Sequence, residues 1–264
     1  MNKYLFIFFA CLLLLTGCHQ KPGKAVVQED RQAKRMLQGI WINDDDDEIA
    51  FKAKGDTIYY PDSTSEPCYF MIVNDTLILK GANETKYLIL KQAPHLFEFK
   101  NQTGDIVSLV KSSDSSDADA FMPKSPVAMN QLNQNQLIKR DSIVIFNNQH
   151  YHSYVQVNPT TYKVFKSSLN DNGVEIDNVY YDNIIHISLF HGDLQIFSHD
   201  FHKDDFQRQV RTDILKQCIL SDILFQGMDK DGAHYLAEIC LPDSPSSYEV
   251  KIIISYQGKL KMFI

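Results

Sequence analysis

The sequence from residue 39 onward is built from short stretches in which apolar and polar side chains alternate, separated by turn residues. The alternation is clearest at residues 248–256, where every second side chain is apolar and the others include Glu249, Lys251 and Ser255. A strand of an antiparallel sheet has this period of two, because one face is buried and the other meets water. The chain is therefore predicted to be mainly β.

Residues 39–111 have the turn spacing of an antiparallel β-meander. Gly55 and Asn74-Asp75 supply tight turns. The expected strands are residues 48–53, 57–60, 69–73, 76–80, 86–90, 96–99 and 106–110. Short strands at this spacing can close as a barrel or half-barrel, and only six or seven fit here.

The second half predicts an antiparallel sheet or sandwich with one packed helix. The expected strands include residues 151–157, 161–169, 184–190, 194–199, 223–228, 234–241, 248–256 and 259–264. Asn158-Pro159 and Asn172-Gly173 are expected as turns between strands. The helix is predicted over residues 203–218, because Phe206, Val210, Ile214 and Cys218 recur every four residues as one apolar stripe.

The order of these segments predicts two β domains with a polar linker between them. The stretch SSDSSDADA and the Gln/Asn-rich stretch after it have too few apolar residues for a core. The predicted division is a signal peptide at 1–17, a tether at 18–35, a lipocalin-like β domain at 36–111, a linker at 112–140 and a C-terminal β-rich domain at 141–264.

The first residues have the layout of a secretory signal, with Lys3 ahead of an apolar run that is too short for a transmembrane helix. The run ends in Leu15-Thr16-Gly17-Cys18, which resembles a bacterial lipobox. The resemblance implies that Cys18 is acylated, for example with palmitate, and anchors the mature protein to the outer membrane. Surface-exported Bacteroidetes lipoproteins resemble one another in having acidic residues next, whereas His19–Lys24 is basic, which favours the periplasmic face over the cell surface.

Charge and cysteine content limit the remaining possibilities. The net charge is −7, so a nucleic-acid partner, which needs clustered Lys and Arg, is not expected. Outside the signal and Cys18, the cysteines are Cys68, Cys218 and Cys240. In an oxidising compartment Cys218–Cys240 is a possible disulfide, and three buried thiols are the alternative.

Gly39-Ile40-Trp41 at the start of the meander resembles the Gly-x-Trp signature of lipocalins and of lipocalin-like domains in Bacteroidetes lipoproteins. The resemblance implies that the Trp41 side chain plugs the closed end of a barrel. An ordinary core tryptophan is the alternative. A closed cavity would support a carrier of a small apolar ligand, and a filled core would oppose it. The residues that would line such a cavity are Phe70, Ile72, Leu77, Leu88 and Phe97.

The second half, from HYHSYVQVNPTTYKVF to the C-terminus, is similar to a family of uncharacterised Bacteroidetes lipoproteins that is grouped only as a domain of unknown function. The segments ILSDILF, EICLPD and ISYQGKL belong to the similarity. The family has no assigned activity or catalytic residue, so it implies location and no chemistry.

Histidines are the candidates for a metal site. His150 and His152 lie on one face of a strand, where two imidazoles can chelate zinc. A solvent-facing polar row is the alternative. Asp229-Lys230-Asp231-Gly232, together with Glu238, resembles part of a calcium-binding loop. The first position of that loop would be Gly227, where a carboxylate is needed, so an Asp-Gly hairpin turn is expected instead. The acidic run at residues 44–48 is expected to be a solvated loop.

The sequence has none of the established catalytic motifs, such as HExxH, GxSxG, a Walker loop or CxxC. We therefore expect a lipid-anchored envelope protein with a non-enzymatic role in binding or assembly and no cofactor. Its expected partners are the membrane, through the N-terminal lipid, and an envelope protein or a small apolar ligand. A lipocalin-like carrier and a metal-dependent hydrolase that uses His150 and His152 are the alternatives.

Overall fold

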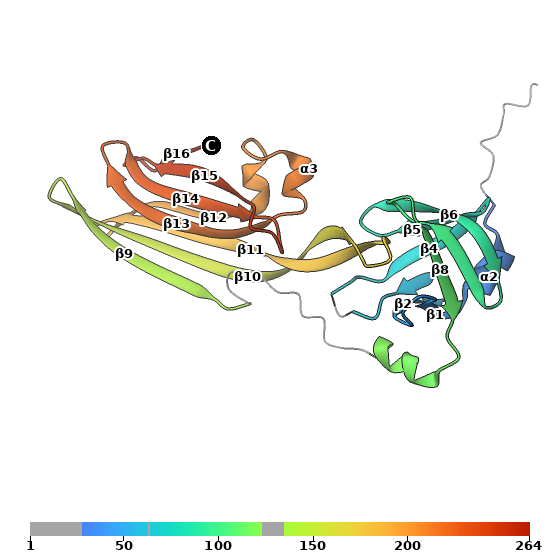
Figure 1. Ribbon diagram of the computed structural model, residues 1–264. Coiled ribbons are helices and arrows are strands. Elements are labelled where there is room, and N and C mark those ends of the chain that lie inside the picture. The colour runs from blue at the N-terminus through green and yellow to red at the C-terminus, as the bar shows by residue number, and fades with distance from the viewer. Residues whose placement is uncertain (1–27, 63, 123–134) are drawn as a thin grey trace, which may run out of the picture.

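The computed structural model describes residues 28–62, 64–122 and 135–264. The molecule is elongated, with an N-terminal barrel at one end and two sheets at the other (Figure 1). The prediction of a mainly β, antiparallel protein is confirmed. In the part of the chain that the structure describes, no helix has the length and apolar character needed to cross a bilayer.

Eight strands form a closed antiparallel barrel in which each strand pairs with the next and β8 pairs with β1. Asn74 and Asp75 both have positive φ, which is the backbone of a two-residue hairpin turn. The strands are β1 (Gly39–Asn43), β2 (Ile49–Lys54), β3 (Thr57–Tyr59), β4 (Cys68–Val73), β5 (Thr76–Lys80), β6 (Glu84–Ala93), β7 (Leu96–Lys100) and β8 (Ile106–Lys111).

The expectation of six or seven strands was wrong, because it omitted β1. Gly39–Asn43 contains the Gly-Ile-Trp motif itself, and it pairs with both β2 and β8. A strand with neighbours on both edges is what closes the sheet into a barrel. The motif therefore forms the closing strand and does not merely precede the meander.

The C-terminal half contains two four-stranded antiparallel sheets that share one apolar core. The first has the order β12-β11-β10-β9, and the second β13-β14-β15-β16. We call this unit the sandwich. Its strands are β9 (Ile138–Phe146), β10 (Gln149–Leu169), β11 (Glu175–His191), β12 (Leu194–Phe201), β13 (Ile219–Asp229), β14 (Gly232–Cys240), β15 (Ser247–Ile254) and β16 (Leu260–Phe263).

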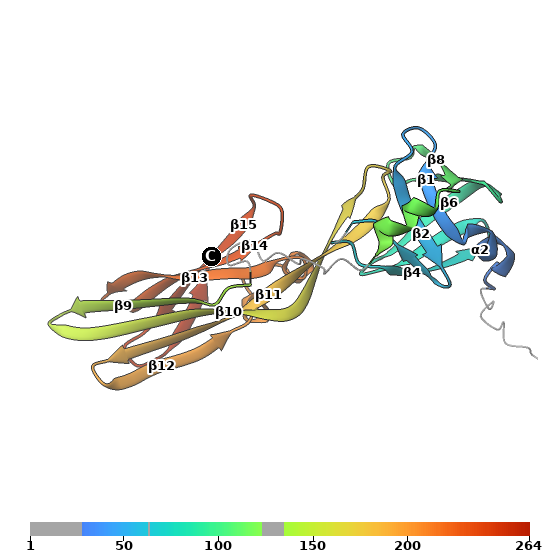
Figure 2. The ribbon, with the colours of Figure 1, turned by 90° about the horizontal axis from the view of Figure 1, so that it is seen from below.

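β10 and β11 are much longer than the other strands, and in both views they reach from the sandwich to the barrel (Figure 1 and Figure 2). The predicted turn at Asn158-Pro159 was wrong, because β10 continues through it. Its ladder with β11 is interrupted between Pro159 and Lys163, where the register shifts. Proline has no N–H for the ladder, so the strand bulges there without turning back. Beyond the bulge, residues 163–181 form a two-stranded ribbon, which we call the arm.

The predicted helix over residues 203–218 is broken into two short pieces. They are the 3₁₀ helix η3 (Lys203–Phe206) and the helix α3 (Thr212–Leu215). Of the predicted stripe, Phe206, Val210 and Cys218 are buried, whereas Ile214 is only partly buried and its neighbour Leu215 is buried. A continuous helix would have buried Ile214 instead of Leu215. Packing against the core therefore determines where the helical pieces form, and the four-residue spacing of apolar side chains does not.

Two further helices flank the barrel. α2 (Arg31–Leu37) is capped by Asp30, whose carboxylate accepts the backbone N–H groups of Gln32 and Ala33, and it spans the predicted boundary between the tether and the barrel domain. η2 (Ser115–Phe121) follows β8. β9 begins at Ile138, inside the predicted linker. Residues 1–27, with the predicted signal and Cys18, and residues 123–134 of the linker lie outside the described residues.

Candidate functional site

One end of the barrel is closed by the chain segment that leads into it. Trp41 is completely buried, and its indole Nε1 donates to the Leu37 carbonyl at the end of α2 over 2.7 Å. The Lys111 ammonium lies 5.0 Å from the centroid of the Trp41 ring and donates to the Met36 carbonyl. Burial lowers the pKa of Lys111. Gly39 has a φ of +124°, a conformation that other residues rarely adopt.

The barrel interior is filled with side chains. Aromatic rings run along it, with centroid distances of 5.8 Å for Trp41–Phe97, 5.5 Å for Phe97–Phe99 and 5.6 Å for Phe99–Tyr87. Four of the five residues proposed to line a cavity are buried in this core: Phe70, Ile72, Leu77 and Phe97. The fifth, Leu88, is 52% exposed, so its assignment to the interior was wrong.

A small apolar void remains near the other end, which we call the mouth. It measures about 10 Å³, and its lining is Phe51, Ile58, Tyr60, Leu77, Leu79, Tyr87, Phe99 and Val174. This volume holds about one water molecule, whereas ligand pockets usually measure about 300–1,000 Å³. The filled core opposes the alternative that the barrel is a carrier of a small apolar ligand.

The mouth is closed by the tip of the arm. Val174, which follows the Asn172-Gly173 turn, is only 7% exposed and belongs to the barrel core. The next residue, Glu175, donates its backbone N–H to the Tyr87 hydroxyl over 2.8 Å. Burial raises the pKa of Tyr87 to about 12. The barrel is therefore completed by a residue from the other half of the chain.

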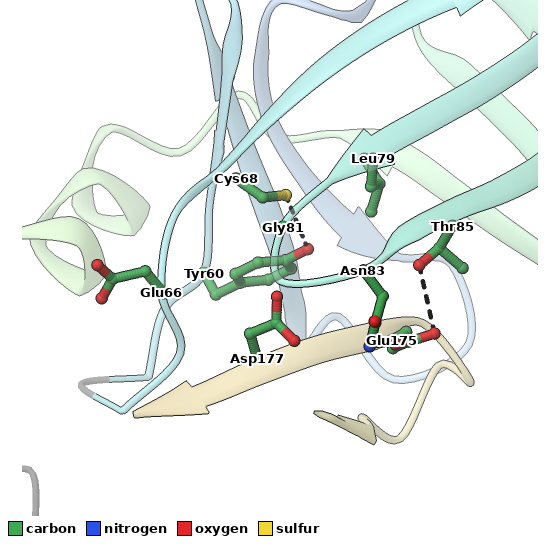
Figure 3. A pocket seen from close by; sticks show the side chains of 9 residues that line it. All are labelled: Tyr60, Glu66, Cys68, Leu79, Gly81, Asn83, Thr85, Glu175 and Asp177. Carbon is green, nitrogen blue, oxygen red and sulfur yellow. Dashed lines mark hydrogen bonds between the residues drawn. The ribbon is translucent and has the colours of Figure 1, made fainter. Parts of the chain in front are cut away.

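Asp177 of the arm is the main polar contact at the mouth (Figure 3). Its carboxylate accepts the Ala82 N–H at 2.6 Å and the Ser167 hydroxyl at 2.7 Å, and its carbonyl accepts the Glu66 N–H at 2.9 Å. A Cβ on Gly81 would stand 2.2 Å from the carboxylate oxygen Oδ2 of Asp177. The absence of a side chain at Gly81 thus makes the close approach of the arm possible.

The loop between β3 and β4 adds a short stretch of strand to the arm. Ser65 forms an antiparallel bridge with Asn178, and Val179 donates its N–H to the Thr64 carbonyl over 3.1 Å. The Lys163 ammonium pairs with the Glu66 carboxylate. The arm therefore contacts the barrel through backbone pairing as well as through Val174.

A buried thiol lies beside this contact. Cys68 Sγ is 3.6 Å from the Tyr60 hydroxyl, and both residues are buried. Burial raises the pKa of Cys68 and, more strongly, that of Tyr60. A thiol with a raised pKa is a poor nucleophile, so Cys68 is expected to be unreactive while the arm is docked.

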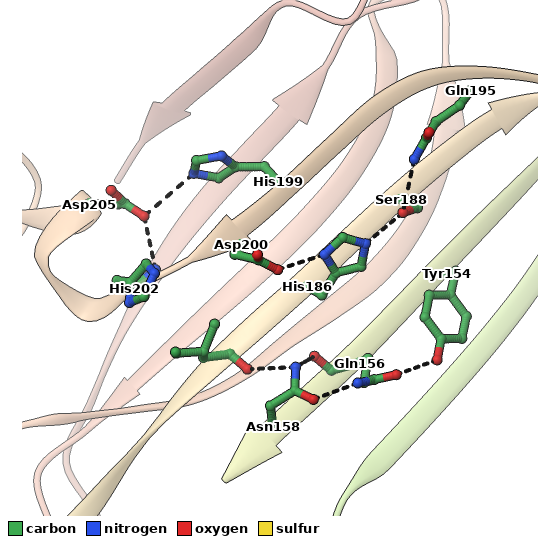
Figure 4. Close-up of polar contacts among 11 residues, drawn as sticks. Tyr154, Gln156, Asn158, His186, Ser188, Gln195, His199, Asp200, His202 and Asp205 are labelled. Atoms are coloured by element: carbon green, nitrogen blue, oxygen red, sulfur yellow. Dashed lines mark hydrogen bonds and ion pairs between the residues drawn. The ribbon is translucent and has the colours of Figure 1, made fainter. Parts of the chain in front are cut away.

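The outer face of the first sheet carries an ordered polar network (Figure 4). His186 Nε2 lies 2.7 Å from Ser188 Oγ, and His186 Nδ1 lies 2.6 Å from Asp200 Oδ1. These contacts have the connectivity of a Ser-His-Asp triad. However, Ser188 is 5% exposed, and its strand β11 has a paired strand on each side. Its neighbouring N–H groups thus face the ladder and do not form an oxyanion hole.

The two histidines proposed as metal ligands lie on this same face. His152 contacts Asp141 on β9 and stacks on Phe190, with ring centroids 5.7 Å apart. In the ladder His150 is opposite Ile145 and His152 is opposite Ile143. Within residues 28–62, 64–122 and 135–264, no group of three or more His, Cys, Asp or Glu side chains is arranged to hold a metal.

Ile143 and Ile145 of β9 are 76% and 63% exposed, although they are large apolar residues. Together with His150, His152 and Phe190 they form what we call the outer patch. β9 is the last strand of its sheet. An exposed apolar group at a sheet edge is a typical place for a protein contact.

Cys218 and Cys240, the pair considered as a possible disulfide, are both free thiols in the structure. Cys218 directly precedes Ile219, which is paired with Cys240, so the two cysteines are diagonal neighbours across β13 and β14. Burial raises the pKa of Cys218 to about 11. The alternative of buried thiols describes Cys218 better, whereas Cys240 is partly exposed.

Two other expectations concerned turns. The predicted hairpin forms, but Asp229 pairs with Gly232, so its two central residues are Lys230-Asp231 and not the predicted Asp231-Gly232. The acidic residues 44–48 form the exposed connection from β1 to β2, as expected of a solvated loop.

Two buried carboxylates near the base of the arm were not predicted from the sequence. Asp222 is held by Arg140 through two bonds of 2.7 Å, and Asp182 accepts the Leu220 N–H and lies 3.3 Å from the Lys203 ammonium. Val174 and Asp177 were not predicted as contact residues either. No local pattern distinguishes these residues from other residues of strands and turns, because their partners are distant in the sequence.

The comparisons with known proteins give one result for the C-terminal half. A family model described as Domain of unknown function (DUF4738) matches residues 117–262, from η2 through the arm and both sheets of the sandwich. No curated protein matches the chain. Because the match covers more than half of the 264 residues, the chain belongs to the DUF4738 family.

Proposed function

We propose that this protein is a lipid-anchored cell-envelope protein with a non-enzymatic role in binding or assembly. The observation that supports a binding role is the contrast between a barrel with a void of about 10 Å³ and a sandwich that exposes Ile143 and Ile145. The barrel is a filled structural unit. A protein partner in the envelope would contact the sandwich at the outer patch.

Anchoring is proposed from the lipobox-like sequence that ends at Cys18. The test is metabolic labelling with an alkyne analogue of palmitate in the native host, for the natural protein and for Cys18→Ala. We expect label and membrane fractionation only with Cys18. Label that persists in Cys18→Ala, or no label in either protein, would contradict the anchor.

The basic tether supports a periplasmic orientation. Protease added to whole cells should then spare the protein and degrade it only after the outer membrane is permeabilised. Degradation in intact cells would place the protein on the cell surface instead.

The binding role is tested by photocrosslinking in intact membranes. A photoreactive residue at Ile143 is compared with one at Leu194, which is 66% exposed on the opposite edge strand β12. We expect one discrete protein adduct from position 143 and none from position 194. Equal adducts at both positions, or none, would remove the outer patch as the partner site.

The hydrolase alternative has its own test. Elemental analysis of the purified protein, with His152→Ala as the comparison, would favour that alternative if stoichiometric zinc were present and then lost in the variant.

A further inference from the structure

An open groove lies beside the bulge in β10, at the base of the arm. It measures about 630 Å³, which is within the usual range of ligand pockets, about 300–1,000 Å³. Residues 158–162 of β10 line it, together with Asn135 and with Tyr181 and Ile184 of β11. Unlike the void of about 10 Å³ in the barrel, this groove has room for a small ligand.

The bulge brings the side chains of the groove to the surface. Residues 160–162 of β10 stand opposite Asp182 alone, because the ladder with β11 resumes only at Lys163. The missing N–H of Pro159 accounts for one lost ladder bond, and not for three residues outside the pairing. A bulge redirects side chains and is common next to active sites, so an interruption of this size is consistent with a binding role.

Two polar side chains of the groove are held in place by the fold. The Asn158 amide donates to the Ile184 carbonyl over 3.2 Å and accepts from the Gln156 amide (Figure 4). The Thr160 hydroxyl donates to the Asp182 carbonyl over 2.7 Å. Because these bonds fix both side chains before a ligand arrives, a further hydrogen bond to either oxygen costs little conformational entropy.

Two other side chains of the groove keep their hydroxyl groups available. Among the described residues, no hydrogen bond engages the hydroxyl of Thr161 or that of Tyr162. Tyr162 is also 60% exposed, so its aromatic ring is open to solvent beside the groove. Such a tyrosine offers a ligand a flat apolar ring and a hydroxyl that both donates and accepts.

The chemistry of the lining selects one class of ligand. In the described part of the chain, no Asp, Glu, Lys, Arg or His side chain lines the groove, so nothing there balances an ionic ligand. The lining instead combines hydroxyl and amide groups with the apolar surfaces of Pro159, Ile184 and the Tyr162 ring. A sugar ring has matching surfaces, since its hydroxyls bond to such polar groups and its C–H face packs against an aromatic ring.

We propose that the groove beside the bulge is a binding site for a neutral saccharide. The Tyr162 ring stacks on one sugar unit, and Asn158, Thr160 and Thr161 form hydrogen bonds with its hydroxyl groups. The groove lies further along β10 than the outer patch. The proposal is therefore independent of a protein partner at that patch and of lipid anchoring.

A glycan array tests the proposal with the purified protein. The array carries neutral oligosaccharides of hexoses, deoxyhexoses and N-acetylhexosamines beside sialylated and sulfated glycans. We expect binding to one or more of the neutral glycans, without a preference for the charged ones. Silence of all the neutral glycans, or binding to charged glycans alone, would overturn the proposal. Binding on a parallel peptide array with every glycan silent would make the groove a peptide site instead.

Variants of Tyr162 test whether the glycan found on the array binds in the groove. Tyr162→Ala should weaken this binding about tenfold, because the stacking surface is lost, whereas Tyr162→Phe keeps the ring and should lose less. Titration calorimetry measures both. Tyr248→Ala removes a 38% exposed tyrosine from the second sheet and, as the matched control, should bind like the natural protein. Full binding by Tyr162→Ala would overturn the proposal.

Nuclear magnetic resonance of the natural protein locates the glycan without any substitution. Adding it should shift the backbone amide signals of Thr160, Tyr162 and Tyr181 until they saturate, because these residues line the groove. The amide of Tyr235, which is buried in the core of the sandwich, should not shift. Shifts centred on the outer patch, for example at Phe190, with the groove signals unchanged, would contradict the assignment of the site.

Discussion

The two ends of the barrel are closed in different ways. At the closed end, Trp41 and α2 are neighbours in the chain, and the indole bonds to a carbonyl four residues earlier. At the mouth, Val174 and Glu175 come from a hairpin whose contact with Tyr87 spans 88 residues. A contact between neighbours costs little chain entropy, whereas a distant one must hold two separately folded units together. The closed end should therefore be part of the barrel's own stability, and the mouth should be adjustable.

The largest effect is expected at the closed end. Trp41→Ala should lower the free energy of unfolding of the barrel by about 3–5 kcal/mol, because it empties a fully buried ring site. This loss is measured by chemical denaturation followed by circular dichroism. Amide exchange distinguishes unfolding of the barrel from unfolding of the sandwich. Tyr162→Ala, at a 60% exposed aromatic residue, should change little. A loss below about 1 kcal/mol would show that Trp41 is not the structural plug.

Alkaline pH should destabilise the barrel through Tyr87. Its pKa is raised to about 12 by burial, so the neutral hydroxyl stabilises the folded barrel below pH 10, and this stability is lost as the pH rises towards 12. Between these two pH values the free energy of unfolding should fall by about 1.4 kcal/mol per pH unit for one such group. Tyr87→Phe should reduce the slope, measured through the fluorescence of the single tryptophan, Trp41.

Tyr60 is also buried with a raised pKa, so some slope should remain in Tyr87→Phe. Tyr235→Phe is the control, because that tyrosine has a pKa of about 12 but lies in the sandwich. An identical barrel slope in the natural protein and Tyr87→Phe would mean that Tyr87 does not titrate with unfolding.

At the mouth, the expected effects are smaller and fall on docking. Val174→Ala should weaken the arm contact by roughly 1–2 kcal/mol, from lost apolar burial, and leave the barrel stable. Faster exchange of the Glu175 amide measures this loss. Leu169→Ala, at a 49% exposed arm residue, is the control. If Val174→Ala instead unfolded the barrel, the two ends would be equivalent and the comparison would fail.

The smallest effect is expected for Asp177→Asn. The change replaces a charged acceptor of the Ala82 N–H by an amide, and should weaken docking by about 1 kcal/mol because the bond is exposed. The Ala82 amide should exchange faster, whereas Asp171→Asn should have no effect. Unchanged exchange would show that the Gly81–Asn83 turn is held by other contacts.

Much of the fold was predictable because strand patterns are local. Alternation identified most barrel and sandwich strands, Asn74-Asp75 forms the predicted turn, and the hairpin predicted at Asp231-Gly232 turns one residue earlier, at Lys230-Asp231. The failures have physical causes. Ile214 fits the helical stripe but Leu215 is buried, and Pro159 resembles a turn residue although it lies at a bulge in a long strand.

The candidate sites were less predictable. His150 and His152 share a sheet face, as their spacing required, but the side chains beside them are Ile143, Ile145 and Phe190. Cys218 and Cys240 are diagonal neighbours across β13 and β14 and are free thiols in the structure, and no local sequence pattern indicates that proximity. Nothing in the sequence around Val174 distinguishes it from a valine beside any other hairpin turn.

By itself, the sequence determined the β-rich class, most of the hairpin turns and the position of the single tryptophan at the start of the barrel. These depend on residues within a few positions of one another, whose side-chain alternation and backbone preferences act locally. Only the tertiary structure decided that β1 closes an eight-stranded barrel, that Val174 caps it and that Asp182 and Asp222 are buried with cationic partners. Those outcomes depend on which distant surfaces meet, and no local pattern encodes that choice.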